Sequence, residues 1–422
     1  MISIKAIREN PINIKERLRS KNDNTDIDYI LDLDSKLRDL KTKSNDLRSE
    51  RNSASQKIAT AKSAGKNSTK IINETRILGD HLKKVENELN VFKKKLSKAL
   101  LSIPNAPHSS VPKGKDESQN ILVREWGHKP DFSFTPKTHM ALGESLKLFD
   151  FKRGAKLSGS GFPLYTGMGA KLERSLINFM LDHHSLEYGF EEVFPSVLMT
   201  KDSMETTGQL PKFQEDMYHT EIDNLYLAPT AEVPITNIHR DEIIKDSDLP
   251  IKYVGYSPCF RRESGSYGKD TRGLLRVHQF NKVELVKFTK PEDSYNELEK
   301  LTLQAESILQ KLGLHYRVIE LCTGDLSFAA AKCYDIEIWA PGEGKWLEVS
   351  SCSNFETFQA QRGKIRYRSS ENSKVDFLHT LNGSGVATPR LMVALLETYQ
   401  KEDGTVNFPS SIEDLLGINK LS

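Results

Sequence analysis

The segment from Pro258 to Glu284 contains the residue types that nucleotide chemistry needs. It reads PCFRRESGSYGKDTRGLLRVHQFNKVE, which predicts a strand, a basic loop that contains glycine, and a second strand. Arg261 and Glu263 leave the first strand, and Phe280 and Glu284 lie on the second. A planar guanidinium can bind phosphate and carboxylate oxygens, an aromatic ring can stack on a base, and a carboxylate can accept from an amine. We therefore expect a nucleotide site on an antiparallel sheet.

The better-known loops that bind nucleotides are missing from the sequence. No GxxxxGK[ST] motif occurs, and the glycines Gly159, Gly161, Gly167 and Gly169 do not form GxGxxG after a strand. Neither a P-loop nor a Rossmann site is expected.

The cysteines and histidines show no spacing typical of metal ligands. Cys259, Cys322, Cys333 and Cys352 are scattered without CxxC, so the sequence predicts neither a zinc ribbon nor a disulfide framework. We interpret them as reduced thiols in or near the core. The histidines, including the pair at 183–184, are interpreted as structural, and no structural zinc is expected.

The elements that must position these residues alternate between strands and helices after residue 111. Strands are predicted at 225–228, 252–256, 282–288, 316–321, 334–339 and 347–350, and helices at 167–187, 291–313 and 385–400. Short connectors between several of the strands indicate an antiparallel sheet flanked by helices, which is an α+β fold.

The front of the chain predicts a long helical hairpin. Residues 12–103 contain no proline and only two glycines. Apolar or small residues recur in steps of three and four over 30–61, with Arg51 as the one charged member, and again over 71–99. The polar turn SAGKNST at 63–69 separates the two series. Two helices of about 32 to 36 residues, rising ~1.5 Å per residue, give an antiparallel coiled-coil hairpin on the order of 50 Å long.

Charge is divided unevenly along a chain whose net charge is only +2. Residues 1–110 hold 23 Lys and Arg against 14 Asp and Glu, a net +9, and residues 111–422 hold 37 against 44, a net −7. The distal half of the predicted hairpin is the most one-sided stretch, with six cations and the single acid Glu50. Its cations are Arg48, Arg51, Lys57, Lys62, Lys66 and Lys70. Because binding of phosphate by Lys and Arg dominates affinity for nucleic acids, we interpret this half as a polyanion-binding surface.

A proline-rich segment separates the hairpin from the rest of the chain. Three prolines at 104–112 prevent the helix from continuing, so we place the boundary between 104 and 115 and expect an arm at 1–110 and a catalytic domain at 111–422. No apolar run approaches the ~20 residues that a membrane span requires. The first residues lack the pattern of a secretory signal, and Glu9 fits an acid-poor transit peptide badly. A cytoplasmic location is expected, with an organellar form left open.

An ordered set of motifs resembles the class II aminoacyl-tRNA synthetases. FRRE with TRGLLRVHQFNKVE resembles motif 2, GSGVATPR followed by LMVALLETYQ resembles motif 3, and GFEEVFPSVLM resembles motif 1. TAEVP, LEVSSCSNFETFQA, LNGSG and VPKGKDESQN together resemble the seryl-tRNA synthetases of the bacterial type. This resemblance spans essentially the whole chain, including the hairpin.

The resemblance implies a fold and a reaction. It implies an N-terminal coiled-coil arm on a class II synthetase domain, which forms seryl-adenylate from L-serine and ATP and transfers serine to the 3′ end of tRNA(Ser). It leaves open whether tRNA(Sec) is a further acceptor, and it implies a homodimer through motif 1 and an arm that presents tRNA to the other subunit's active site. The activation step is in-line attack of a carboxylate on the α-phosphorus, which requires cations, Mg²⁺ and rigid placement.

The resemblance also implies a role for each matching residue. Arg261 binds the α-phosphate, Arg390 stacks above adenine and reaches the γ-phosphate, and Glu348 with Ser351 holds Mg²⁺, because a hard cation prefers oxygen ligands. Phe280 stacks beneath adenine and Glu263 accepts from its amine. The ATP-binding set is Arg261, Arg262, Glu263, Phe280, Glu348, Val349, Ser350, Ser351 and Arg390. The serine-binding set is Thr230, Ala231, Glu232, Glu284, Asn382 and Ser384. The tRNA-binding set consists of the six cations named above in the distal half of the hairpin.

Two segments depart from the family pattern. FQAQR stands where the family usually has FQARR, so Gln361 replaces an arginine, and ATPR stands where motif 3 commonly has AVGR. Pro389 suits the first turn of a helix that begins near Arg390. Two alternatives fit less well. A homologous ligase that charges a carrier protein belongs to a group that lacks the arm, and a silent tRNA- or protein-binding paralogue does not need Arg261, Glu348 and Arg390.

Overall fold

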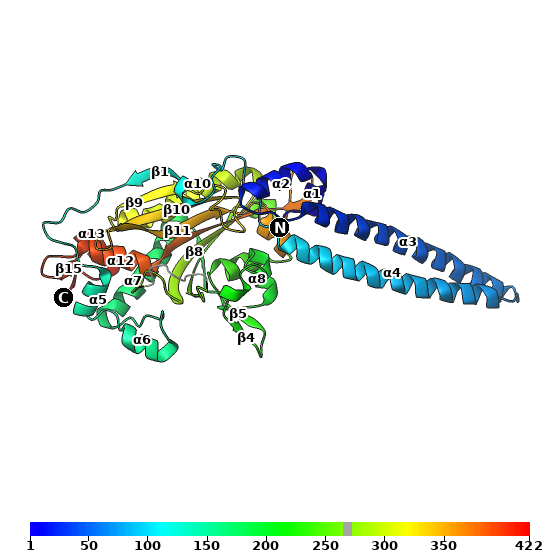
Figure 1. The fold of residues 1–422 in the computed structure, drawn as a ribbon, viewed down its shortest axis with the longest axis horizontal. Coiled ribbons are helices and arrows are strands. Elements are labelled where there is room, and N and C mark those ends of the chain that lie inside the picture. The colour runs from blue at the N-terminus through cyan, green and yellow to red at the C-terminus, as the bar shows by residue number, and fades with distance from the viewer. Residues whose placement is uncertain (265–271) are drawn as a thin grey trace. The chain divides into compact units, whose positions relative to one another are not determined.

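The computed structural model describes residues 1–264 and 272–422, which form two compact units (Figure 1). The arm unit comprises residues 2–19 and 23–104, and the body comprises Met1, residues 20–22 and residues 105–422. Part of the basic loop predicted within 258–284, residues 265–271, lies outside the described residues.

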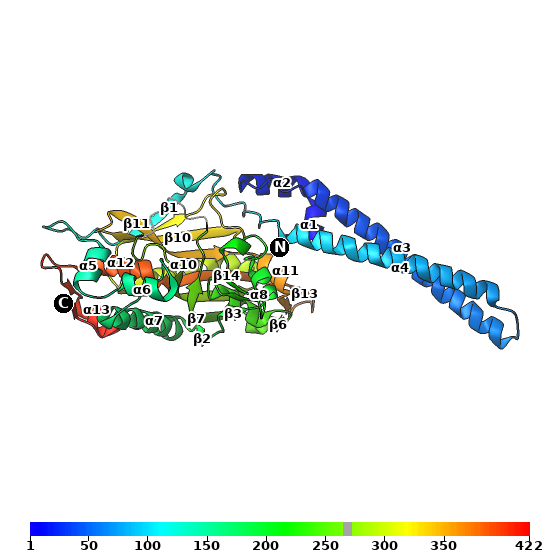
Figure 2. The same ribbon diagram turned by 60° about the horizontal axis from the view of Figure 1, so that its bottom comes forward.

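The arm unit contains the predicted helical hairpin. Helices α3 (Ile27–Ser63) and α4 (Thr69–Leu101) lie side by side in both views (Figures 1 and 2). Asp26 caps α3 by accepting from the backbone N–H of Tyr29 at 2.9 Å, and Gly65 takes a positive φ of 65° in the turn. Buried residues of the predicted series include Ile30, Leu33, Leu40 and Ser44 on α3 and Leu82, Val85 and Leu96 on α4. These buried positions follow the predicted three- and four-residue steps, and the two helices contact each other.

Two short helices precede the hairpin and were not predicted. They are α1 (Ile4–Glu9), capped by Ser3, and α2 (Pro11–Ser20). Each buries only one or two apolar residues, Ile7 on α1 and Ile14 and Leu18 on α2, so neither is long enough to show a clear period.

The six predicted tRNA-binding cations are all exposed in the arm unit. Arg48 is also engaged within it, because its guanidinium forms an ion pair of 2.6 Å with Glu86 across the two helices. The cations from Arg51 to Lys70 therefore form the more one-sided part of this basic surface.

The body is built on one eight-stranded sheet, which confirms the predicted α+β class. Its strands in spatial order are β1 (Ile121–Trp126), β9 (Tyr316–Glu320), β10 (Lys332–Ala340), β11 (Lys345–Asn354), β14 (His379–Ala387), β8 (Gln279–Thr289), β7 (Ile251–Phe260) and β2 (Glu191–Val193). Neighbours are antiparallel except at the β2–β7 edge, where the pairing is parallel.

The three longest helices of the body share one large hydrophobic core with this sheet. They are α7 (Gly167–Tyr188), α10 (Ser294–Lys311) and α12 (Thr388–Tyr399). On β8, Val283 and Leu285 belong to this core. Because side chains alternate along a strand, Lys282 and Glu284 face the opposite side of the sheet. That opposite side carries the polar residues of the motifs.

The remaining elements are short and surround the sheet. The helices are α5 (His139–Ser145), α6 (Phe151–Ser158), α8 (Lys201–Thr207), α9 (Glu232–Thr236), α11 (Phe358–Gly363) and α13 (Ser410–Leu416). Small sheets join β3 (Leu198–Met199), β5 (Leu225–Leu227) and β4 (His219–Thr220), then β13 (Val375–Phe377), β12 (Arg366–Arg368) and β6 (Ile243–Lys245), and finally β15 (Val406–Asn407) and β16 (Lys420–Leu421).

The predicted start of the helix at 385–400 is wrong. Residues 385–387 continue β14, and α12 begins only at Thr388 because Ala387 is still extended, with φ −80° and ψ 127°. Pro389 lies in the first helical turn, as predicted.

The four cysteines are buried and free, which agrees with their interpretation as core thiols. Among the described residues, no helix is both long and apolar enough to cross a membrane.

Candidate active site

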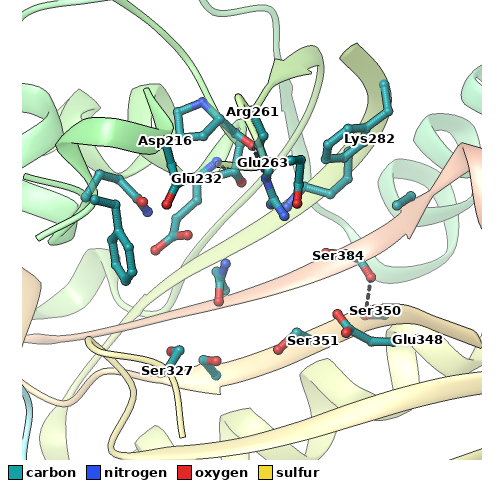
Figure 3. Close-up of a pocket in the computed structure, with 18 of the residues that line it drawn as sticks. Asp216, Glu232, Arg261, Glu263, Lys282, Ser327, Glu348, Ser350, Ser351 and Ser384 are labelled. Atoms are coloured by element: carbon teal, nitrogen blue, oxygen red, sulfur yellow. Dashed lines mark hydrogen bonds between the residues drawn. The ribbon is translucent and has the colours of Figure 1, made fainter. Parts of the chain in front are cut away.

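A cavity of about 620 Å³ opens on the polar side of the sheet. Figure 3 shows Arg261, Glu263 and Lys282 on one side of it and Glu348, Ser350 and Ser351 on the other. The predicted residues that line it are Thr230, Glu232, Arg261, Glu263, Phe280, Glu348, Val349, Ser350, Ser351, Asn382, Ser384 and Arg390. Of the residues predicted to bind ATP or serine, all of which the structure describes, only Arg262, Ala231 and Glu284 do not line it. The structure thus brings together residues that are spread over 160 positions in the chain, from Thr230 to Arg390.

Arg261 and Phe280 lie together in the cationic part of the cavity. Arg261 follows the last residue of β7, and Phe280 is the second residue of β8. The Arg261 guanidinium carbon lies 5.1 Å from the centre of the Phe280 ring, and its Nε donates to the Pro229 carbonyl at 3.3 Å. The ring and the backbone together restrict where the guanidinium can point. The Arg262 backbone N–H donates to the Asp216 carbonyl, and its side chain does not reach the cavity wall.

Glu263 is paired with a cation that the sequence analysis did not assign. Its carboxylate forms an ion pair with Arg276, which also lines the cavity. Glu263 adopts a positive φ of 52°, an uncommon conformation for a residue other than glycine. No role was predicted for Arg276, although it lies within the motif 2 segment. Its ion pair with Glu263 cannot be read from the spacing of the two residues along the chain.

Arg390 is held by the backbone on both sides of the cavity. Its Nη1 donates to the Glu348 carbonyl at 2.7 Å and its Nε donates to the Leu275 carbonyl at 3.1 Å. The Glu348 carboxylate lies 3.9 Å from the same Nη1 and is 51% exposed. These contacts leave Glu348 open to a ligand while its backbone orients Arg390.

Glu348 and Ser351 offer oxygen atoms from the same strand, β11. Both line the cavity, and the Ser351 hydroxyl lies 3.1 Å from the Cys333 thiol. Carboxylate and hydroxyl oxygens are ligands that a hard divalent cation accepts, so this pair fits Mg²⁺.

The acidic part of the cavity is a buried network around Glu284. Its two carboxylate oxygens accept from the Thr230 hydroxyl at 2.9 Å and from the Asn382 amide at 3.0 Å, and Lys282 forms an ion pair with it. Glu284 is fully buried behind the cavity wall, whereas Thr230 and Asn382 reach the wall itself. Ser384 lies opposite Glu284 in the β14–β8 register.

Within this network Glu232 is the acid that lines the cavity, and its surroundings raise its pKa. Burial and the neighbouring Glu284 carboxylate raise its pKa from 4.5 to about 7, against the opposing effects of Gln359, Lys282 and Arg261. The Gln359 amide donates to Glu232 at 2.6 Å, and Gln359 is itself fully buried. An acid with a pKa near neutrality can change charge when a cationic ligand arrives.

Gln359 and Lys282 are functional candidates that sequence reasoning missed. Gln359 lies in the same FQAQR segment in which Gln361 attracted attention. Gln361 instead donates to the Thr357 hydroxyl at 2.8 Å and does not belong to the cavity lining. The only signal for Lys282 in the sequence is its position two residues before Glu284, on the same face of a strand.

Comparisons with known proteins agree with this geometry. Residues 1–107 match the family described as the seryl-tRNA synthetase N-terminal domain, and residues 215–399 match the tRNA synthetase class II core domain (G, H, P, S and T). The serine–tRNA ligase of Carboxydothermus hydrogenoformans is 52% identical over 421 residues, covering 100% of this chain and 99% of the relative. The serine–tRNA ligase of Geobacillus kaustophilus is 53% identical over 418 residues, covering 99% of each chain.

A solved structure with the same fold carries a nucleotide. The seryl-tRNA synthetase from Pyrococcus horikoshii, solved in complex with ATP, is 39% identical and has a TM-score of 0.92, with 100% of this chain and 99% of that chain covered. The chain described here therefore belongs to the serine–tRNA ligase family, a family of class II aminoacyl-tRNA synthetases.

Proposed function

We propose that this chain activates L-serine with ATP in the cavity described above and transfers the seryl group to the 3′ end of tRNA(Ser). One observation carries the proposal. The same cavity joins a cationic part, with Arg261, Phe280 and Arg390, to an acidic part with Glu232 and Thr230. ATP needs the first environment and the ammonium and hydroxyl groups of serine need the second.

The cationic part suits the first chemical step. A carboxylate oxygen of serine forms a bond to the α-phosphorus while the bond from that phosphorus to the β-phosphate oxygen breaks, and pyrophosphate leaves with the electron pair. The nucleophile is already ionised, so no general base is required. Arg261 would neutralise charge that grows on the α-phosphate, Phe280 would stack on adenine, Glu263 would accept from its amine, and Arg390 would bind the γ-phosphate.

Glu348 and Ser351 would hold Mg²⁺ beside the phosphates. When bound, Mg²⁺ supplies positive charge to the phosphate oxygens. Independently of the ion, Glu348 contributes through its backbone, because its carbonyl accepts from Arg390 and so orients that guanidinium.

The acidic part suits recognition of serine. Glu232 would bind the ammonium group, and Thr230, Asn382 and Ser384 would bind the hydroxyl. Ala231 is fully buried beside them, and Glu284 fixes Thr230 and Asn382 from behind. Alanine lacks the hydroxyl and would leave buried polar groups unpaired, so the site would reject it strongly.

The transfer step requires tRNA at the same cavity. A hydroxyl oxygen of the 3′-terminal ribose of tRNA would form an ester bond to the seryl carbonyl carbon while the bond from that carbon to the phosphate oxygen breaks. AMP would leave with the electron pair, and the hydroxyl proton would pass to water. We propose that Arg51, Lys57, Lys62, Lys66 and Lys70 of the arm unit bind tRNA phosphates, since they are exposed and only Glu50 is acidic among residues 48–70. Arg48 belongs to the same surface, although it also pairs with Glu86.

We further propose that the enzyme works as a homodimer through motif 1. Leu186 on α7 and Phe194 just after β2 are both 82% exposed, and large apolar side chains at that exposure suit an interface. Sedimentation equilibrium of the full chain would test this, since a monomer at micromolar concentration contradicts it.

The test of the main proposal is ATP–pyrophosphate exchange with each of the twenty amino acids, followed by charging of tRNA(Ser). Serine alone should support strong exchange, and charging should follow. Absence of serine-dependent exchange contradicts the proposal. Parallel charging of tRNA(Sec) decides whether that tRNA is a second acceptor.

A further inference from the structure

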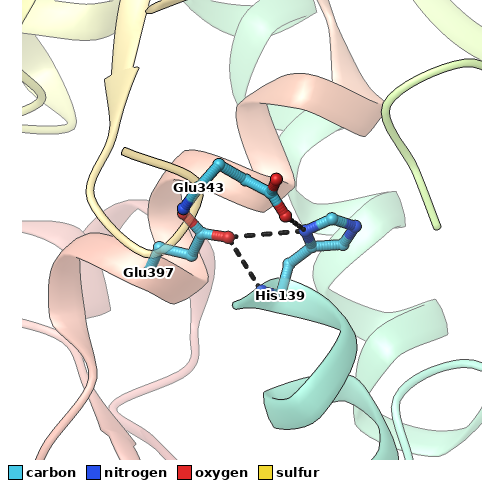
Figure 4. A group of neighbouring side chains, drawn as sticks. All are labelled: His139, Glu343 and Glu397. Atoms are coloured by element: carbon cyan, nitrogen blue, oxygen red, sulfur yellow. Dashed lines mark hydrogen bonds and ion pairs between the residues drawn. The ribbon is translucent and has the colours of Figure 1, made fainter. Parts of the chain in front are cut away.

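A buried cluster behind the cavity joins His139 at the start of α5 with two glutamates from distant parts of the chain (Figure 4). His139 Nδ1 lies 3.2 Å from an oxygen of Glu343, between β10 and β11, and 3.4 Å from an oxygen of Glu397 on α12. His139 and Glu397 are fully buried, and the Glu343 side chain is only 7% exposed. None of the three takes part in the reaction steps proposed above.

The other ring nitrogen of His139 defines where the proton must be. Nε2 accepts a hydrogen bond from the backbone N–H of Leu274 at 3.2 Å. It therefore carries a lone pair, and in a neutral imidazole the proton must lie on Nδ1. There it points between the two carboxylates. Among the described residues Nδ1 has no acceptor in hydrogen-bond geometry, and the oxygens of Glu343 and Glu397 lie 3.2 and 3.4 Å from it.

This proton argues against a metal ion in the cluster, although a histidine and two carboxylates are a common ligand set. A metal would bind the lone pair of Nδ1 and force the proton onto Nε2. That proton would then face the Leu274 N–H, and two donors would oppose each other in a buried place. The arrangement is consistent only with the neutral Nδ1–H ring.

Glu397 ties this ring to the rest of the body. One of its oxygens accepts from the backbone N–H of His139 at 2.8 Å, and the other accepts from those of Gly342 and Glu343 at 2.8 and 3.0 Å. Its carboxylate thus joins the start of α5, the turn after β10, and α12, the helix whose first turn carries Arg390.

The ring in turn supports the segment that follows the loop of motif 2. Gly273 has a φ of 59°, and a Cβ there would collide with His139 Nε2. Glycine therefore lets the backbone approach closely enough for the Leu274 hydrogen bond. Leu274 and Leu275 both line the cavity, and the Leu275 carbonyl accepts from Arg390.

We propose that His139 is a positioning residue for ATP binding: held by Glu343 and Glu397 as the neutral Nδ1–H ring, it fixes the Leu274–Leu275 backbone that orients the Arg390 guanidinium. The inference rests on the proposed function of Arg390 and concerns ATP, not serine.

Two substitutions distinguish the role of Nε2 from the role of Nδ1. His139→Gln places an amide oxygen near Nε2, where it can still accept from Leu274, whereas His139→Asn keeps a donor near Nδ1 and loses that acceptor. In serine-dependent exchange, His139→Asn should raise the KM for ATP about tenfold and leave the KM for serine unchanged. The expected size is that of losing one hydrogen bond that positions a charged group. His139→Gln should restore most of the ATP affinity.

His183→Asn is the matched control. His183 is buried, bonds the Ser307 hydroxyl at 2.8 Å and does not line the cavity, so its loss should lower thermal stability without changing either KM. Equal effects of His139→Asn on both KM values, or no rescue by His139→Gln, would overturn the proposal.

The tautomer can be measured in the wild-type full chain. With ¹⁵N-labelled histidine, long-range ¹H–¹⁵N spectra should show a neutral Nδ1–H ring for the signal that disappears in His139→Gln. An Nε2–H ring, a doubly protonated ring, or a stoichiometric metal other than Mg²⁺ in the purified protein would overturn the proposal. Because this readout does not depend on catalysis, failure of the proposed function and failure of the role of His139 remain distinguishable.

Discussion

Gln359 and Glu232 are buried partners whose orientation is defined by a third residue. The Gln359 amide nitrogen donates to Glu232 at 2.6 Å, and its amide oxygen accepts from the Thr380 hydroxyl at 2.7 Å. Because a hydroxyl donor faces the oxygen, the NH₂ group must face Glu232. The hydrogen bond from Gln359 thus favours the ionised form of Glu232, whereas burial raises the pKa of this carboxyl.

Gln359→Met should impair serine binding selectively. The substitution keeps the length of the side chain but removes the donor, so the pKa of Glu232 should rise further and its ionised form should become rarer. Loss of a hydrogen bond to a charged group costs about 1.5–3 kcal/mol, which predicts an increase of roughly 10- to 100-fold in the KM for serine at neutral pH. Exchange kinetics with serine and ATP varied separately would measure it.

Gln361→Met is the matched control for that experiment. Gln361 bonds the Thr357 hydroxyl and lies outside the cavity lining, although it belongs to the same helix as Gln359. Its variant should retain both KM values. A similar loss in both variants would assign the effect to α11 as a whole.

Serine binding should depend on pH through Glu232. The raised pKa of about 7 means that the carboxyl is mostly protonated below pH 7 and mostly ionised above it. If the ionised form binds the ammonium group, the KM for serine should fall as the pH rises from about 6 to 8 and then level off. Glu232→Gln should raise this KM and remove the pH dependence; a flat wild-type profile would contradict the role of Glu232.

The same shift predicts a stability effect of defined sign. The pKa of Glu232 in the folded chain lies above its ordinary value of 4.5, so the folded state holds more protons between pH 4.5 and about 7. Its contribution to stability must therefore decrease as the pH rises through this window. Thermal unfolding of the chain without ligands should show that Glu232→Gln gains stability relative to the wild type as the pH increases from about 5 to 8.

Arg261→Ala should reduce the rate of activation rather than only substrate affinity. By comparison with the loss of one preorganised donor to developing charge, the kcat for exchange should fall by about 10²–10³. Arg261→Lys should recover part of the rate, because it restores charge without the planar fork. Arg262→Ala, at a residue outside the cavity lining, should stay close to the wild type. The reverse ranking would move the α-phosphate contact to Arg262.

Removal of the distal cations should affect charging but not activation. A variant with alanine at Arg51, Lys57, Lys62, Lys66 and Lys70 should keep serine-dependent exchange and raise the KM for tRNA. For every phosphate that is no longer bound, the slope of log affinity against log salt should become shallower by about 0.7 to 0.9. Alanine at Lys93, Lys94, Lys95 and Lys98, exposed residues nearer the base of the hairpin, provides a control of similar charge change.

Local patterns were sufficient to predict the hairpin and most elements of the body. Several residues at the steps of three and four are buried in α3 and α4, because residues at this spacing share one face of a helix. The same local reasoning missed α1 and α2, which are too short to show a period. It also misplaced the start of α12, because the extended strand β14 continues into the motif 3 segment.

The motifs likewise indicated residues that the structure brings together on one cavity, but not their partners. The sequence by itself indicated Arg261, Glu348 and Arg390, and the structure places all three on one cavity. It could not show that Arg276 pairs with Glu263, that Glu284 is enclosed by Thr230, Asn382 and Lys282, or that Gln359 bonds Glu232.

Sequence alone therefore determined the family, the helical arm and the residue types of the site, because these depend on local spacing and ordered motifs. Tertiary structure decided which groups share a buried space. His139 meets Glu397 across 258 positions, and Glu232 approaches Glu284 across 52. Desolvation and charge pairing act through distance in space, so the raised pKa of Glu232 and the preference of His139 for a single tautomer arise only in the folded chain.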